Sequence, residues 1–188
     1  MTIDWVQLGA DIGQGNEAGT HVAQRALEHL LGRANIAAAV NLVLTFGNGW
    51  ELAESVLVYI QSRHALDLAY QVYKTATGEQ RGRAIWLIKN LCHPHALTWV
   101  PEFLADPDAA EGGIEVLDQL IFGRMADPDS EEVVALLTQA EQHPSRYVRE
   151  KAAYIRRYLQ DFDALDALHD EYYATHGTPG WMPPVDTR

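Results

Sequence analysis

The chain has 188 residues, of which 47% are hydrophobic, so it can bury one sizeable core and we expect a single domain over residues 1–188. Its formal net charge of −12 at pH 7 argues against a nucleic-acid ligand, because phosphate binding requires a basic surface, and it suits a basic protein partner. The single cysteine, Cys92, excludes an internal disulfide framework and is typical of a reducing, cytoplasmic environment.

Helical periodicity runs through almost the whole chain, and short breakers divide it into roughly nine or ten helices. In the first half, we expect helices over residues 16–33, 35–46, 51–61 and 64–76. The first of these ends at Gly32 and is expected to cap the N-terminal end. The second is apolar all round, so we expect it to be buried between its neighbours. No segment shows the sustained two-residue alternation of a strand.

The second half repeats one helical phrase, in which small or apolar residues recur at the same spacing after a short breaker. The three copies cover residues 81–92, 110–121 and 148–159. Shorter helices are expected between them, over residues 97–104 and 131–140. We also expect a C-terminal capping helix over residues 160–174 and an extended, Gly/Pro-rich tail over residues 175–188, which contains Trp181.

The apolar positions of the phrase predict stacked helix pairs. The matched positions are Ile85, Ile114 and Ala152, then Ile88, Leu117 and Ile155, then Cys92, Ile121 and Leu159. A single amphipathic helix pair cannot bury both of its sides, so stacking supplies the core and terminal helices must cap it. The alternative is an irregular helical bundle.

The last copy, with the turn before it, resembles the second helix of a HEAT repeat. The residues that match the pattern of that family are Pro144, Val148, Arg149, Ala152 and Leu159. His143 stands where Asp is usual, and Gly112 and Gly113 replace the usual Val-Arg in the middle copy, so that repeat is atypical. The resemblance covers residues 34–159 and implies a right-handed α-solenoid of antiparallel helix pairs. It is silent on activity, because HEAT proteins serve scaffolding, transport, lyase and DNA-repair roles.

Acidic residues concentrate between residues 101 and 133, where ten Asp and Glu residues accompany one basic residue, Arg124. Glu111, Glu115 and Asp118 are spaced i, i+4 and i+7, so they form one stripe along a helix. In HEAT-like stacks the second helix of each pair lines the concave side, which would place this stripe in a groove. Like charges on one face cost stability, so a basic partner would relieve the repulsion. The alternative is a solvated face of an acidic protein.

The corresponding outward positions in the other two copies carry Trp86 with Lys89, and Ala153 with Arg156. An exposed tryptophan beside charges of both signs suits a protein partner, because tryptophan is a favoured interface anchor. The alternative is that Trp86 packs on the adjacent helix. The candidate partner-binding residues are therefore Trp86, Lys89, Glu111, Glu115, Asp118 and Arg156.

The sequence contains no constellation that we would assign to catalysis or metal binding. Cys92, His93 and His95 surround a proline, and His169 adjoins two acids, but no second cluster at zinc-ligand spacing accompanies them. Turn and capping roles are expected for His93 and His95. Cys92 aligns with core positions of the other copies, so we expect it to be a small buried hydrophobic residue. No catalytic residue, metal or cofactor is predicted.

These observations predict a non-enzymatic module that binds and sequesters a basic protein, with no nucleic-acid or membrane partner. No apolar run approaches the roughly 20 residues of a membrane span, and the first residues lack the pattern of a signal peptide. In size, charge and helical class, the chain is similar to immunity proteins of bacterial toxin systems, several of which neutralise cationic nucleases. That likeness implies occlusion of a basic partner by an acidic concave face. The alternatives are an enzyme or enzyme-assisting solenoid of the lyase or hydroxylase type, and a general scaffold.

Overall fold

A computed structural model of the chain describes residues 3–14 and 19–176, and beyond residue 161 it describes mainly the backbone. Within these ranges the chain forms nine α-helices and one 3-10 helix, and no strand. In chain order they are α1 (Trp5–Asp11), α2 (Thr20–Thr45), α3 (Trp50–Ile60), α4 (Arg63–Thr75), α5 (Gly78–Leu91), η1 (Pro94–Trp99), α6 (Val100–Ala105), α7 (Ala110–Phe122), α8 (Glu131–Glu141) and α9 (Arg146–His176). The all-α class is therefore confirmed.

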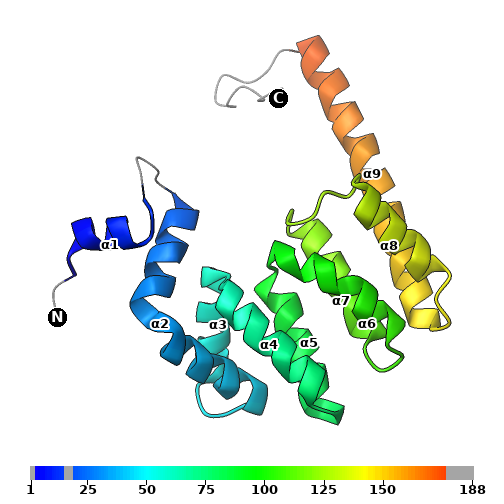
Figure 1. Ribbon diagram of the computed structural model, residues 1–188. Helices are drawn as coiled ribbons and strands as arrows, with labels where there is room; N and C mark the ends of the chain where they lie inside the picture. The colour runs from blue at the N-terminus through cyan, green and yellow to red at the C-terminus, as the bar shows by residue number, and fades with distance from the viewer. Residues whose placement is uncertain (1–2, 15–18, 177–188) are drawn as a thin grey trace.

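Helices that follow one another in the chain pack together in pairs. α2 contacts α3, α4 contacts α5, α6 contacts α7, and α8 contacts α9. The second helices of these pairs also meet in order, since α3 contacts α5, α5 contacts α7, and α7 contacts α9. The pairs follow one another in a curved row from α2 to α9 (Figure 1). None of the described helices is both long enough and apolar enough to cross a lipid bilayer.

The core lies between the helices of this row and includes the apolar positions of the repeated phrase. Ile88, Leu117 and Ile155 have no exposed surface, so this predicted set is fully buried. The side chains at the other matched positions are buried or, at Leu159, partly buried against the core. Periodicity therefore predicted the inward face of all three copies correctly, because burial repeats with the turn of the helix.

The same hydrogen bond occurs in four X-Pro-Y turns. In each, the side chain of the residue before the proline accepts a hydrogen bond from the backbone N–H of the residue after the proline. The bonds run from His95 to His93 Nδ1 (3.1 Å), from Asp108 to Asp106 Oδ1 (3.0 Å), from Asp129 to Asp127 Oδ1 (3.0 Å) and from Ser145 to His143 Nδ1 (3.0 Å). Asp is a common acceptor in such turns. The expected turn role of His93 is confirmed, and His143 replaces the usual Asp because its ring nitrogen accepts the same bond.

The helix boundaries differ from expectation at both ends. α1 covers residues 5–11, for which no helix was predicted, and Asp4 caps it, because its carboxylate accepts from the N–H groups of Val6 and Gln7. The break expected at Gly32 occurs as a kink inside α2, where Gly32 has φ 71°. The separate helix expected over residues 160–174 is instead the continuation of α9. No glycine or proline interrupts residues 146–176, so nothing stops the helix there. Residues 177–188, with Trp181, lie outside the described residues.

Candidate functional site

A pocket of about 270 Å3 lies between α5 and α7, and we call it the α5–α7 pocket. Its lining residues are Gly82, Ile85, Trp86, Lys89, Asp108, Gly112 and Glu115. Trp86, Lys89 and Glu115 were predicted to bind a partner, and the fold places these three around one opening. The pocket therefore joins part of the predicted aromatic site with part of the predicted acidic stripe.

Two glycines shape the pocket. A Cβ atom at Gly112 would lie 2.5 Å from Cγ2 of Ile85, so only glycine lets α7 approach α5 this closely. A Cβ atom at Gly82 would meet nothing within 4 Å, so this glycine leaves an open gap at the surface. The two glycines therefore have different roles: Gly112 sets the distance between the helices, and Gly82 opens the pocket.

Trp86 forms one wall, and a cluster of aromatic side chains holds its ring. Its ring meets Phe46 edge to face with centroids 6.3 Å apart, and it meets Trp50 of α3 in the same way at 6.0 Å. Edge-to-face contacts of this kind stabilise aromatic pairs and fix their orientation. Trp86 therefore packs on the adjacent helix, as the alternative hypothesis predicted, and it is half-buried at the pocket where the partner-binding hypothesis expected an exposed tryptophan.

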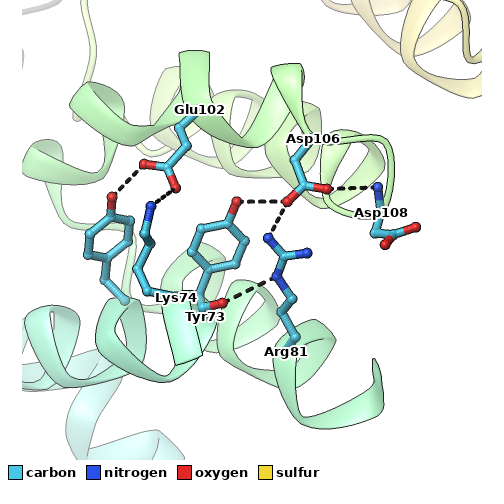
Figure 2. Close-up of polar contacts among 7 residues, drawn as sticks. Tyr73, Lys74, Arg81, Glu102, Asp106 and Asp108 are labelled. Carbon is cyan, nitrogen blue, oxygen red and sulfur yellow. Dashed lines mark hydrogen bonds and ion pairs between the residues drawn. The ribbon is translucent and has the colours of Figure 1, made fainter. Parts of the chain in front are cut away.

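The acid at one end of the pocket, Asp108, belongs to the turn between α6 and α7, and a polar network fixes that turn. Asp106 accepts hydrogen bonds from the Tyr73 hydroxyl (3.1 Å) and from the guanidinium of Arg81 (Figure 2). Arg81 also donates from Nε to the carbonyl oxygen of Tyr73, at 3.2 Å. Burial alone would raise the pKa of Asp106, but the N–H of Asp108, the Tyr73 hydroxyl and Arg81 outweigh it and lower that pKa. Asp106 is therefore a fixed carboxylate that joins the turn to α4 and α5.

A second carboxylate, Glu102 of α6, continues this network along α4. It accepts hydrogen bonds from the hydroxyl of Tyr70 (2.5 Å) and from the ammonium of Lys74 (2.7 Å). Burial, together with the hydrogen bond to Glu102, raises the pKa of Tyr70 to about 12. The two carboxylates therefore hold α6 against α4 and leave Asp108 as the member of the turn that faces outward.

Asp108 differs from Asp106 although only a proline separates them. Its backbone N–H bonds to Asp106, but its carboxylate points away from the network (Figure 2). No described residue makes a hydrogen bond or ion pair with that carboxylate, and Asp108 is exposed at the pocket. It is therefore an available acceptor for a cation or for a hydrogen-bond donor.

The predicted acidic stripe on α7 meets α9, which supplies its partners. The ammonium of Lys151 lies 2.7 Å from Asp118 and 3.5 Å from Glu115. The hydroxyl of Tyr147 donates to Glu115 as well. Sequence reasoning missed Tyr147 and Lys151, because they lie more than thirty residues away and the helical pattern does not give the rotation of α9. Much of the charge of the stripe is therefore neutralised inside the chain.

The pKa values of this cluster reflect two carboxylates around one ammonium. Burial, together with the charge of Glu115, raises the pKa of Asp118 and outweighs the hydrogen bond and charge of Lys151, which lower it. Burial alone would lower the pKa of Lys151, but the hydrogen bond to Asp118 and the charges of Asp118 and Glu115 raise it. Lys151 is therefore held firmly as a cation, whereas Asp118 is a half-buried acid that is costly to ionise.

The remaining predicted residues separate. Glu111 is exposed and accepts a hydrogen bond from the Ser145 hydroxyl at 3.3 Å. Arg156 lies on the side of α9 that faces α8, where it pairs with Glu141 at 2.7 Å and donates to the Thr138 hydroxyl at 2.8 Å. The fold therefore brings Trp86, Lys89 and Glu115 together, with Glu111 and Asp118 on the same helix, and leaves Arg156 apart.

A larger cavity of about 600 Å3 lies beside α2 and α4, and two contacts join titratable residues of its wall. Asp11 lies 3.4 Å from His29, and Arg63 lies 2.7 Å from Asp67. These contacts involve Asp11 and Asp67, and none of the predicted partner-binding residues lines this cavity.

Potential metal ligands are dispersed in the described part of the chain, where no three His, Cys, Asp or Glu side chains gather to hold an ion. Cys92 is 8% exposed and its Sγ lies 3.3 Å from the carbonyl oxygen of Gln119, which confirms its predicted burial. Burial raises the pKa of this thiol. The side chain of His169, the other histidine considered for a metal site, lies outside the described residues.

In comparisons with protein families, with curated proteins and with solved structures, no match to the chain is found. The resemblance to HEAT repeats, and the likeness to immunity proteins, therefore stay predictions.

Proposed function

We propose that the chain is a non-enzymatic protein-binding module, built as a right-handed, HEAT-like α-solenoid, that binds a basic segment of a partner protein. The pairing of consecutive helices, together with the contacts of α3 with α5, α5 with α7 and α7 with α9, supports the solenoid arrangement. In such a stack the second helices share one face. The α5–α7 pocket opens between two of them.

The observation that carries the proposal is the α5–α7 pocket, which is lined by both a held tryptophan and an available carboxylate. Trp86 is oriented by Phe46 and Trp50, so little side-chain entropy is lost when a partner packs on it. Asp108 and Glu111 lie exposed at the start of α7 and give this edge a negative charge. The net charge of −12 adds a long-range attraction for a basic partner.

The internal pairing of the stripe changes which acids should meet the partner. Glu115 and Asp118 already contact Lys151, so a partner would have to compete with α9 for them. Asp108 and Glu111 have no ion pair with any described residue, so they are free to attract a cation. We therefore expect the acids at the N-terminal end of α7, and not those in its middle, to attract the basic partner.

Selection from a library of random dodecapeptides tests the proposal without a known partner. The folded chain should enrich sequences rich in Arg and Lys, and the selected peptides should bind more weakly as salt increases. Charge reversal of both Asp108 and Glu111 to lysine should weaken binding at least about tenfold, which is about 1.4 kcal/mol.

The matched control is the double variant Glu131→Lys, Glu132→Lys, which changes the net charge equally at exposed positions of α8. This variant should retain most of the affinity, because its charges lie away from the pocket. Selected peptides without basic residues, or equal losses in both double variants, would contradict the proposal.

A further inference from the structure

We infer that the α5–α7 pocket receives a single arginine side chain of the partner, an assignment that rests on the proposed function. The pocket measures about 270 Å3, below the range of about 300–1,000 Å3 that is usual for small-molecule sites. A space of this size suits one long side chain and is too small for a folded segment.

The position of the charges follows from the way in which α5 and α7 lie together. Ile85 sits against Gly112, and Cys92 Sγ contacts the carbonyl oxygen of Gln119, so the two helices run in the same direction. Gly82 and Asp108 therefore mark one end of the pocket, and Lys89 and Glu115 mark the other. Lys89 lines the pocket at the Glu115 end, and its charge lowers the pKa of Asp118.

A cation that enters the pocket is therefore expected at the Asp108 end. The gap at Gly82 and the surfaces of Ile85 and Gly112 offer an apolar path for the aliphatic part of the side chain. Trp86 supplies an aromatic surface for the charged end, and Asp108 supplies a carboxylate. The pocket thus carries a negative charge at the Asp108 end and has an apolar surface along Ile85 and Gly112.

Arginine fits these features better than lysine does. Its planar guanidinium can stack on an indole and at the same time donate two parallel hydrogen bonds to one carboxylate, whereas an ammonium is a compact, strongly hydrated charge. The guanidinium is also less strongly hydrated, so less free energy is needed to bring it against Trp86. The pocket would thus select arginine among the basic residues of a partner segment.

The experiment uses the 15N-labelled full chain and three probes: octa-arginine, octa-lysine and octa-glutamate. The chain has five tryptophans, and the indole N–H signal of Trp86 is assigned by its loss in Trp86→Phe. Octa-arginine should shift this signal, together with the amide signals of Gly82 and Gly112, and it should bind about tenfold more tightly than octa-lysine. Octa-glutamate should leave these signals in place.

Two variants locate the arginine, and each has a matched control. Asp108→Asn should weaken octa-arginine binding about tenfold, whereas Asp129→Asn, at the same position of the other Asp-Pro-Asp turn, should leave it unchanged. Gly82→Leu should fill the pocket and abolish the Trp86 shift. Gln71→Leu, which adds the same side chain at an exposed position of α4, should not.

The possible results separate this inference from the proposed function. If octa-arginine binds the chain but leaves the Trp86 signal in place, or if Gly82→Leu keeps full affinity, the pocket assignment is wrong and the binding function stands. Equal binding of octa-lysine with an equal Trp86 shift overturns the selection for arginine. If neither basic peptide binds at low salt, both the inference and the proposed function fail.

Discussion

The ammonium of Lys151 in α9 lies 2.7 Å from a carboxylate oxygen of Asp118 in α7, with only 21% and 15% of the two side chains exposed. This pair joins two second helices of the row, and Glu115 shares the same ammonium at 3.5 Å. The acidic stripe of α7, which the sequence predicted to bind a basic partner, is thus already in contact with a basic residue of the same chain. The contact therefore has structural consequences that can be measured.

Replacing Lys151 with methionine should destabilise the chain. The change keeps an unbranched side chain but leaves two half-buried carboxylates without their cation, so the free energy of unfolding should fall by about 1–3 kcal/mol at pH 7. Urea unfolding followed by circular dichroism measures this change. Lys74→Met serves as the control, because Lys74 pairs with Glu102 at a more exposed place (47% and 37%) and should cost about 1 kcal/mol or less.

The loss in Lys151→Met should shrink as the pH falls from 7 to 4. Burial raises the pKa of Asp118 in the folded chain, so folding favours its protonated form and the ionised form becomes more costly as the pH rises. Acid therefore removes the charge that the variant leaves unpaired. A loss that is the same at pH 7 and pH 4 would show that Lys151 acts through packing alone.

Asp106 and Asp127 allow a second comparison, because each begins an Asp-Pro-Asp turn and accepts the same 3.0 Å backbone hydrogen bond. Substitution of either by alanine removes that bond, but only Asp106→Ala also removes the contacts with Tyr73 and Arg81. We expect Asp106→Ala to cost about 2–3 kcal/mol more than Asp127→Ala in urea unfolding at pH 7.

The difference between these two variants should disappear in acid. The hydrogen bonds to Asp106 hold its pKa below the usual value, so its contribution is present above the pKa of the unfolded chain and is lost as the pH falls through the lower, folded value. The wild-type chain should therefore lose stability below about pH 4, and it should lose more than Asp106→Ala does. Equal costs for the two alanine variants at pH 7 would contradict a structural role for the network.

The buried positions of the repeated phrase were predicted from the sequence, because they recur with the helical period. The contacts between side chains of different helices were missed, because they depend on how each helix is rotated about its axis. Ile88, Leu117 and Ile155 are buried because one face of each phrase turns inward, and periodicity shows this directly. The partner of Asp118 could not be read in this way, because Lys151 and Arg156 are both basic residues of α9 and only the rotation of that helix selects between them.

The α5–α7 pocket could not be predicted from the sequence for a related reason. Gly82 and Gly112 lie in two separate helical phrases of the sequence, and their roles appear only when the helices lie side by side. In contrast, the continuation of α9 beyond Leu159 could have been predicted, since no glycine or proline separates the last phrase from the expected capping helix.

His93 should make stability depend on pH between 7 and 5. Burial, with the nearby charges of Arg63 and His95, lowers its pKa, and its Nδ1 must stay unprotonated to accept the N–H of His95 at 3.1 Å. The contribution of His93 to the free energy of unfolding is therefore complete above the pKa of the histidine in the unfolded chain, about 6.5. It is lost as the pH falls through the lower pKa of the folded chain. His93→Asn keeps an acceptor that does not titrate, so its free energy of unfolding should fall less than that of the wild-type chain over this range. Parallel pH profiles would exclude this role.

Cys92 should react slowly with thiol reagents in the folded chain. Its side chain is buried, and burial raises the pKa of the thiol more than the contact with Gln119 lowers it, so little thiolate forms at pH 8. Reaction with Ellman's reagent should be at least about a hundredfold slower than in urea, where the thiol has the usual pKa of about 8.5. Rapid reaction without denaturant would mean that α5 separates readily from α7.

Alanine at Gly82 and at Gly113 should have opposite effects on stability. Both glycines lie inside helices with ordinary backbone angles, so alanine gains about 0.5–1 kcal/mol of helix propensity at each position. At Gly82 the new methyl group meets nothing within 4 Å, and the gain should appear as a higher free energy of unfolding. At Gly113 it would lie 2.7 Å from Cβ of Phe103 and 3.3 Å from the backbone nitrogen of Leu104.

Because a backbone atom cannot move away without shifting α6, the clash at Gly113 should outweigh the gain in propensity and lower the free energy of unfolding by about 1–3 kcal/mol. Urea unfolding of the two variants beside the wild-type chain gives the sign directly. The two positions differ in packing and hardly in propensity, so a Gly113→Ala that stabilises the chain as Gly82→Ala does would mean that α6 and α7 are not packed at this distance. A stabilising Gly82→Ala, in turn, would show that Gly82 has no structural need to be glycine, as expected if its space is kept for a ligand.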